Sequence, residues 1–164
     1  MTAEEIIERL GLEELDHEGG FFKRIFTSQA SVCPGGVERP AGTSIVFLVT
    51  PEDFSALHRL KQVEFYTHIG GDILELNLLD PGSGTATQVL LGPISELNTV
   101  PFYEVSADLW QGSRLGEGAE QNWALVSCTM SPGFEWSEFE LGDRAQLKRR
   151  FPESSEIIEA LTRI

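Results

Sequence analysis

The sequence is poor in positive charge. It has 12 Lys and Arg residues against 26 Asp and Glu residues, which gives a formal net charge of −14 at pH 7. A surface this negative repels phosphate backbones and anionic lipid. The composition therefore argues against nucleic acid and membrane surfaces as partners.

Cysteine is also scarce. Cys33 and Cys128 are far apart and form no C-x-x-C pair, so a disulfide framework is excluded, although a single bridge between them is not. We expect free thiols in a reducing compartment, with Cys128, which lies in an apolar run, as a core residue. The opening residues, MTAEEIIERLGL, lack the basic and apolar regions of a secretory leader, and no run is long enough to span a bilayer. The cytoplasm is the expected location.

Several motifs of well-known enzyme classes are missing. The chain contains no P-loop, no G-x-G-x-x-G, no G-x-S-x-G and no H-E-x-x-H. The 164 residues are enough for one domain with a real core, so we expect a single domain over 1–164.

Helical patterns occur only near the two ends of the chain. Thr2 and Glu5 form a capping-box pattern, the next residues place apolar side chains on one helical face, and Gly11 is a suitable stop. Near the other end, Asp143 is a suitable N-cap, and Pro152 separates that helix from a last amphipathic one. The sequence predicts a short N-terminal helix and C-terminal helices.

Between these ends the helical period disappears. Short β-branched or aromatic runs, bounded by Gly, Pro, Asp or Ser, take its place. No long helical segment separates them, which argues against a parallel α/β sheet and favours an all-β sandwich or barrel. The runs are GTSIVFLVTP (42–51), VEFYTHIGG (63–71), DILELNLLD (72–80), ATQVLLGP (86–93) and WALVSCTMSPGF (123–134).

Alternation along the strands separates a polar face from an apolar one. Glu64, Tyr66 and His68 share one face of their strand, and in the next strand Glu75 lies opposite the face of Leu74. In an ordinary sandwich the polar face would be exposed to water. In a barrel wide enough to hold a ligand, it can line the cavity instead.

At this point the residues resemble a known family. HRLKQVEFYTHIGGDILEL (58–76) is similar to the first cupin motif, G-x5-H-x-H-x3/4-E-x6-G, and its E-x6-G half is matched by Glu64 and Gly71. VSADLWQGS (105–113) lies where the second cupin motif is expected. Longer matches resemble the uncharacterised domain of unknown function 985, also called cupin family five. They are HEGGFF (17–22), TPEDFSALHR (50–59), GDILELNLL (71–79) and WALVSCTMSPGFEWSEFELGDR (123–144).

The resemblance implies a fold but no reaction. It implies the cupin double-stranded β-helix, a jelly-roll barrel, assembled as a homodimer. Because one fold supports many activities, the chemistry has to be argued from the site.

The resemblance also implies where a metal would bind. Cupins hold transition metals with three imidazoles and a carboxylate. His58 matches the first histidine and Glu64 the carboxylate, but Leu60 and Gln111 stand where the other two histidines belong. His68 is the available substitute. We therefore expect no metal cofactor, and a divalent ion is the alternative.

Our first hypothesis is a protein that binds a small polar metabolite, sugar-like or carboxylated, in the barrel. Cupin-fold sugar epimerases work without metal, using a histidine base and a tyrosine acid. Whether the chain is an enzyme is left open; if it is one, the analogy favours an isomerase or epimerase, with His58 and Glu64 as the catalytic acid–base pair. The side chains expected to bind the ligand are Tyr66, His68, Glu75, Trp110 and Gln111.

Two alternatives remain open at this stage. The first is a metal-dependent enzyme that adds His68 or Gln111 to His58 and Glu64 as a non-standard ligand. The second is a non-catalytic, dimeric binding module whose barrel is filled by its own side chains.

Overall fold

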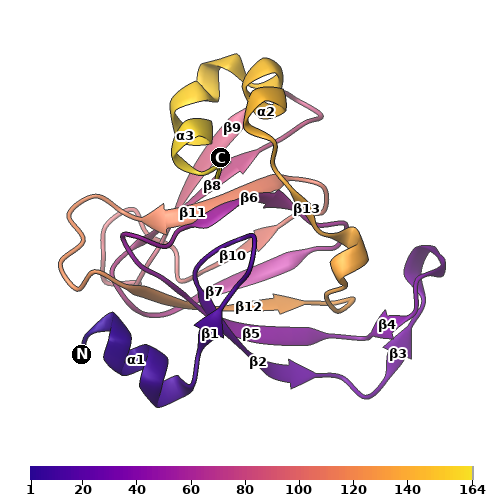
Figure 1. Ribbon diagram of the computed structural model, residues 1–164, viewed down its shortest axis with the longest axis horizontal. Coiled ribbons are helices and arrows are strands. Elements are labelled where there is room, and N and C mark those ends of the chain that lie inside the picture. The colour runs from indigo at the N-terminus through magenta and orange to yellow at the C-terminus, as the bar shows by residue number, and fades with distance from the viewer. Residues whose placement is uncertain (164) are drawn as a thin grey trace.

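Two antiparallel sheets face each other across the core (Figure 1). The computed structural model describes residues 1–163. One sheet contains, in spatial order, β1 (Glu13–Glu14), β2 (Phe21–Thr27), β5 (Thr43–Val49), β12 (Ala124–Met130), β7 (Glu64–Gly71) and β10 (Phe102–Val105). The other contains β13 (Glu140–Leu141), β6 (Ser55–Arg59), β11 (Trp110–Leu115), β8 (Leu74–Leu79) and β9 (Ala86–Leu91). This is the predicted all-β cupin double-stranded β-helix.

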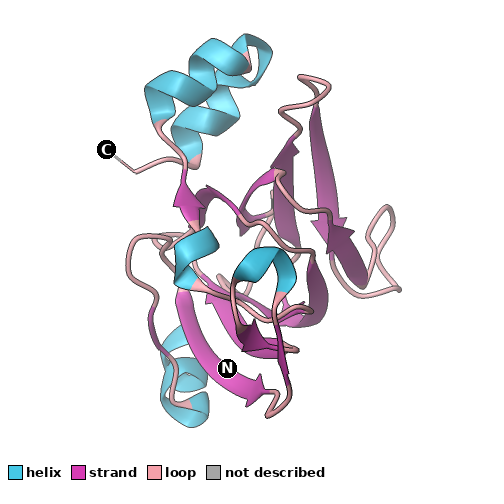
Figure 2. Cartoon of the chain, turned by 90° about the vertical axis from the view of Figure 1, so that its right-hand side faces the viewer, coloured by secondary structure: helices cyan, strands magenta, loops and turns pink. Residues whose placement is uncertain are grey.

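The helices lie outside the barrel, as Figures 1 and 2 show. α1 (Ala3–Leu10) packs on the outer side of the six-stranded sheet, while α2 (Arg144–Arg150) and α3 (Ser155–Ala160) pack on the five-stranded sheet. The predicted capping box of α1 is present, and Gly11 ends that helix at φ +63°. The Asp143 side chain accepts from the Gln146 backbone N–H, as an N-cap does.

The barrel interior is built from the inward faces of both sheets. Its buried residues include Phe47, Leu76, Val126 and Cys128. A second cluster lies between the five-stranded sheet and α2 and α3. Because β6 and β8 lie between these two cores, nearly every residue in them is buried, including the polar ones.

Some strands carry no clear sequence signal. The runs predicted from the sequence do not include β2, β6, β10 or β11, because polar residues interrupt these four strands. The polar, glycine-bearing segment 113–122 begins as the last part of β11. The segment 31–42 contains β3 (Ser31–Val32), η1 (Pro34–Gly36) and β4 (Arg39–Pro40), a hairpin that projects from the barrel (Figure 1). Within residues 1–163, no helix reaches the length and apolarity needed to cross a membrane.

Candidate functional site

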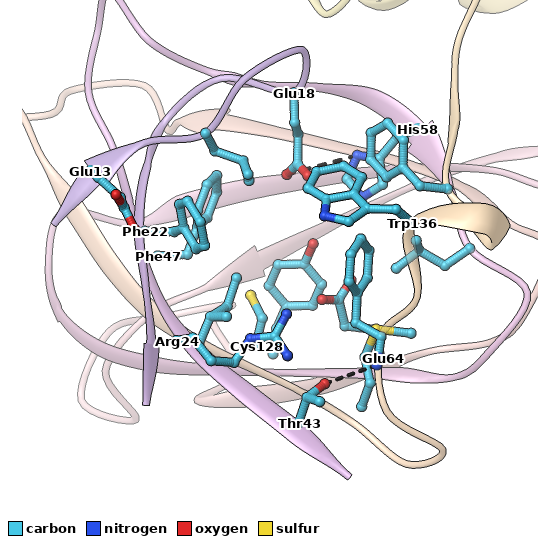
Figure 3. Close-up of a pocket in the computed structure, with 17 residues that line it drawn as sticks. Glu13, Glu18, Phe22, Arg24, Thr43, Phe47, His58, Glu64, Cys128 and Trp136 are labelled. Carbon is cyan, nitrogen blue, oxygen red and sulfur yellow. Dashed lines mark hydrogen bonds and ion pairs between the residues drawn. The ribbon is translucent and has the colours of Figure 1, made fainter. Parts of the chain in front are cut away.

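A cavity of about 350 Å³ opens between the two sheets, mostly against the inner face of the six-stranded sheet. This volume is at the lower end of the range typical of small-molecule sites. Figure 3 shows the side chains that surround it. They are Glu13, Leu15, Glu18, Phe22, Arg24, Thr43, Ile45, Phe47, His58, Leu60, Glu64, Tyr66, Cys128, Met130, Phe134, Trp136 and Phe139.

His58 is held in one tautomer by its neighbours. The Ala56 carbonyl can only accept, so His58 Nδ1–H donates to it, at 2.8 Å. Nε2 is then the acceptor, and the Gln111 side-chain amide lies 3.3 Å from it. The ring also stacks on Phe139, with centroids 5.3 Å apart. Both ring nitrogens are therefore engaged within the protein.

Gln111 joins the two predicted catalytic residues. β11 pairs with β6 so that Gln111 lies opposite His58, and the same amide nitrogen donates to Glu64 Oε2 at 2.7 Å. The amide oxygen, which is buried, has no hydrogen-bond partner among residues 1–163. Such an unpaired acceptor is costly, and proteins tend to keep such costs at functional positions.

The Glu64 carboxyl is buried without a compensating cation. Burial raises its pKa from 4.5 to about 7, and the negative charge of Glu18 acts in the same direction. His58 and the hydrogen bonds from Gln111 and Tyr66 partly oppose the shift. Near neutral pH this carboxyl can therefore either hold or accept a proton, as a general acid–base group requires.

Tyr66 and Cys128 stay protonated beside it. Burial, followed by the negative charge of Glu64, raises the pKa of the Tyr66 hydroxyl well above 10. Burial likewise raises the pKa of the Cys128 thiol, which makes Cys128 a poor nucleophile. Tyr66 can therefore act as a neutral hydrogen-bond donor next to Glu64.

Glu18 is a cavity residue that sequence reasoning did not assign to the site. The turn that carries it uses left-handed backbone at His17, Gly19 and Gly20, and a Cβ at Gly20 would lie 2.6 Å from the Phe47 ring. The Ser55 hydroxyl donates to Glu18 Oε1 at 2.7 Å, and His58 Nδ1 lies 3.9 Å from the same oxygen. The family match HEGGFF (17–22) includes Glu18, but a match at a turn does not tell whether the side chain points into the cavity.

The other predicted ligand-binding residues lie elsewhere. His68, further along β7, donates from Nε2 to the Asp72 carbonyl at 3.0 Å and does not line the cavity. Glu75 and Trp110 lie on the outer face of the five-stranded sheet. There Glu75 pairs with Arg114 at 2.9 Å, and Trp110 packs under α2 with Arg59 over its ring. Of the seven predicted residues, the structure brings together His58, Glu64, Tyr66 and Gln111.

An aromatic segment covers the cavity mouth. Phe134, Trp136 and Phe139 contact one another edge to face, with ring centroids 4.9 Å and 5.3 Å apart, and Trp136 is 54% exposed. The segment is anchored by Arg39, whose buried guanidinium donates to both Glu138 oxygens, at 2.6 and 2.5 Å. Arg39 is therefore a buried anchor for this segment.

The donor set does not fit a transition metal. Leu60, which offers no lone pair, lines the cavity near His58 and Glu64. The Gln111 amide nitrogen, a donor and not a ligand, already occupies the facing atoms of both residues. No cluster of three His, Cys, Asp or Glu side chains suited to a metal occurs within residues 1–163.

The family follows from comparison with known proteins. The family model described as Cupin superfamily (DUF985) matches residues 4–142. The chain belongs to this family. No curated protein matches it in sequence.

Solved structures agree with this DUF985 membership. A hypothetical protein from Leishmania major is 33% identical, with a TM-score of 0.91 and full coverage of both chains. A protein from Shewanella oneidensis is 28% identical, with a TM-score of 0.88 over 99% of this chain and 98% of its own. An oxalate decarboxylase variant from Bacillus subtilis is 13% identical, with a TM-score of 0.57 over 92% of this chain and 37% of its own. The last likeness concerns the fold alone.

Proposed function

We propose that this DUF985 cupin binds a small polar metabolite in its barrel and exchanges a proton with it, as a metal-independent isomerase or epimerase. The observation that carries the proposal is the Glu64 carboxyl, which lines the cavity, is only 7% exposed and has a pKa of about 7. A carboxyl that only stabilised the fold would more commonly be paired with a cation.

The residues around Glu64 support a proton-transfer step. Glu64 in its ionised form takes a proton from a carbon next to a carbonyl group of the ligand. The electron pair of that C–H bond moves onto the carbonyl oxygen. The Tyr66 hydroxyl, which donates to the ionised Glu64, turns to this oxygen as Glu64 takes up the proton. In an isomerisation, Glu64 returns the proton to the former carbonyl carbon, while the hydroxyl proton of the deprotonated carbon passes to the former carbonyl oxygen. In an epimerisation, the intermediate turns over in the cavity before Glu64 returns the proton to the other face of the same carbon.

In this proposal His58 supports the site and is not the base. Its Nδ1 is bonded to the Ala56 carbonyl and its Nε2 faces the Gln111 amide, so neither nitrogen is free for a ligand. Through Gln111, His58 fixes the Glu64 side chain in its orientation. The sequence hypothesis made His58 the acid or the base, with Glu64 as its partner, and the geometry favours Glu64 as the base.

The experiment has two stages. A thermal-shift screen over neutral sugars, amines, hydroxy acids and sugar phosphates identifies ligands, because a molecule that binds the folded state raises the melting temperature. Each ligand is then incubated with protein in D₂O, and deuterium incorporation at carbon is followed by NMR.

The proposal expects incorporation with the wild type and a loss of about 100-fold or more in Glu64→Gln, the lower range for a general base. Glu75→Gln, at a buried carboxyl outside the cavity, is the matched control and keeps the wild-type rate. Equal exchange in Glu64→Gln and wild type, or a screen without any ligand, would refute the proposal.

A further inference from the structure

The charges that line the cavity are mainly negative. Glu13, Glu18 and Glu64 contribute carboxyl groups, and Arg24 is the cation among the described lining residues. Arg24 belongs to β2 and is exposed, and its guanidinium lies 5.9 Å from the Phe134 ring centroid. Glu13, Glu18 and Glu64 therefore outnumber the Arg24 guanidinium by three to one among the described charged groups of the lining.

The polar groups in the buried part are mostly acceptors. Glu18 is largely buried, and its Oε1 is occupied by Ser55 and faces His58. Its other oxygen, Oε2, takes part in no hydrogen bond with residues 1–163, so it is available to a donor on a ligand. Figure 3 shows Glu18 and Glu64 on different sides of the cavity, both with their carboxyl groups toward it.

Aromatic rings form much of the remaining wall. Phe22, Phe47 and Tyr66 come from the six-stranded sheet, while the segment at the mouth adds Phe134, Trp136 and Phe139. The face of an aromatic ring carries partial negative charge and attracts organic cations, and the attraction is stronger where water is excluded. Rings together with unpaired carboxylate oxygens are a suitable environment for an ammonium group.

We infer that the ligand of this cavity carries a positively charged amine, on a body that packs against the aromatic rings, and not a carboxylate or a phosphate. This inference rests on the proposed function, because it names the chemical class of the same cavity's ligand. It excludes the carboxylated metabolites that the sequence hypothesis also allowed. The net charge of −14 acts in the same direction, because the field of an acidic protein concentrates cations near its surface.

The test varies the charge of the ligand while its body stays constant. One set of probes is 2-phenylethylamine, 2-phenylethanol and 3-phenylpropionate, and the other is glucosamine, glucose and glucuronate. Calorimetric titration at pH 7.5 gives the affinity of each probe for the full chain. We expect the amine of at least one set to bind about tenfold more tightly than its neutral partner, which is the usual gain from a charge-assisted hydrogen bond. The carboxylate of that set is expected to bind more weakly than both.

Variants assign the preference to the cavity. Glu18→Gln is expected to lower the amine's affinity about tenfold and to leave the neutral probe unchanged. Glu75→Gln, outside the cavity, is expected to change neither. A carboxylate that binds as tightly as its amine, an amine preference that survives Glu18→Gln, or no binding by either amine would overturn the inference.

These outcomes are separable from failure of the proposed function. Proton exchange that depends on Glu64, with a neutral or acidic ligand from the broad screen, would uphold the proposed function and overturn the amine assignment. An amine that binds through Glu18 but shows no Glu64-dependent exchange would uphold the amine assignment and overturn the proposed function.

Discussion

Glu64 and Glu75 are both buried carboxyls, one on each sheet, and their surroundings differ in a single decisive respect. Glu75 is 4% exposed and lies between the Arg114 guanidinium, at 2.9 Å, and the Asn77 amide, at 3.0 Å. Glu64 is 7% exposed and has the Gln111 amide and Tyr66 as neutral partners. A cation compensates the first carboxyl. The second is hydrogen-bonded only to neutral groups and forms no ion pair with a Lys or Arg side chain among residues 1–163.

The comparison shows that the same kind of buried side chain can form a structural ion pair on one sheet and a titratable group on the other. On the outer face of the five-stranded sheet, the Arg114 guanidinium compensates a buried carboxylate near the start of α3. Inside the barrel, a similar burial without a cation leaves Glu64 with a pKa of about 7. Substitutions at Glu64 and at the Glu75–Arg114 pair should therefore have different effects on stability and on its pH dependence.

The largest expected effect is on the pH dependence of stability in Glu64→Gln. Because the folded-state pKa of Glu64 is raised from 4.5 to about 7, the folded protein holds this proton more tightly than the unfolded chain does. The wild type therefore loses stability relative to Glu64→Gln as pH rises from 4.5 to 7, by about 3 kcal/mol in total. Urea unfolding at a series of pH values measures the difference.

Glu75→Gln serves as the control for that series. It removes a buried carboxyl that is paired with Arg114 and lies outside the cavity. A Glu64→Gln profile that runs parallel to the wild type would remove the distinction between the two carboxyls.

The second effect is a loss of stability in Arg114→Met. This change leaves the Glu75 carboxylate buried without its cation. Breaking a fully buried pair costs about 3–5 kcal/mol, but the Arg114 side chain is 43% exposed, so we expect about 2 kcal/mol. The double variant with Glu75→Gln should recover most of this loss in urea unfolding. If the double variant is no more stable than Arg114→Met, the ion pair does not hold the outer face.

The third effect concerns Gln111→Leu, which removes the amide between His58 and Glu64. Two buried acceptors lose their donor, while the unpaired Gln111 oxygen is removed as well, so we expect a net loss of about 1 kcal/mol. The hydrogen bond from Gln111 lowers the pKa of Glu64, so that pKa should rise further in the variant. Urea unfolding and carboxyl NMR measure the two quantities, and a fall in the pKa would show that Gln111 does not hold the ionised form.

Much of the architecture could be predicted from local patterns. The capping box at Thr2 and Glu5 and the left-handed stop at Gly11 are fixed by residues next to one another in the sequence. The E-x6-G spacing and the strand alternation placed Glu64 and Tyr66 on one face, and the cupin motifs placed His58 and Gln111 with them. These are the residues that the structure brings together.

The positions of Glu75 and Trp110 could not be predicted. They depend on which face of each strand points into the barrel, and alternation alone does not determine that. In β7 the polar face lines the barrel, but in β8 the face of Leu74 does, so Glu75 points outward beneath the C-terminal helices. Trp110 follows the same logic, because it neighbours Gln111 and therefore lies on the opposite face. Glu18 reaches the cavity through a turn, and no periodic pattern reports a turn's direction.

The most direct test of the central claim is a titration of the Glu64 carboxyl carbon by NMR. Protein labelled with ¹³C at the glutamate side-chain carboxyl is followed from pH 4 to 9, and Glu64→Gln identifies the resonance. The account predicts a transition with its midpoint near pH 7. A midpoint near 4.5, the ordinary value for glutamate, would contradict the claim that this cavity keeps a proton available at neutral pH.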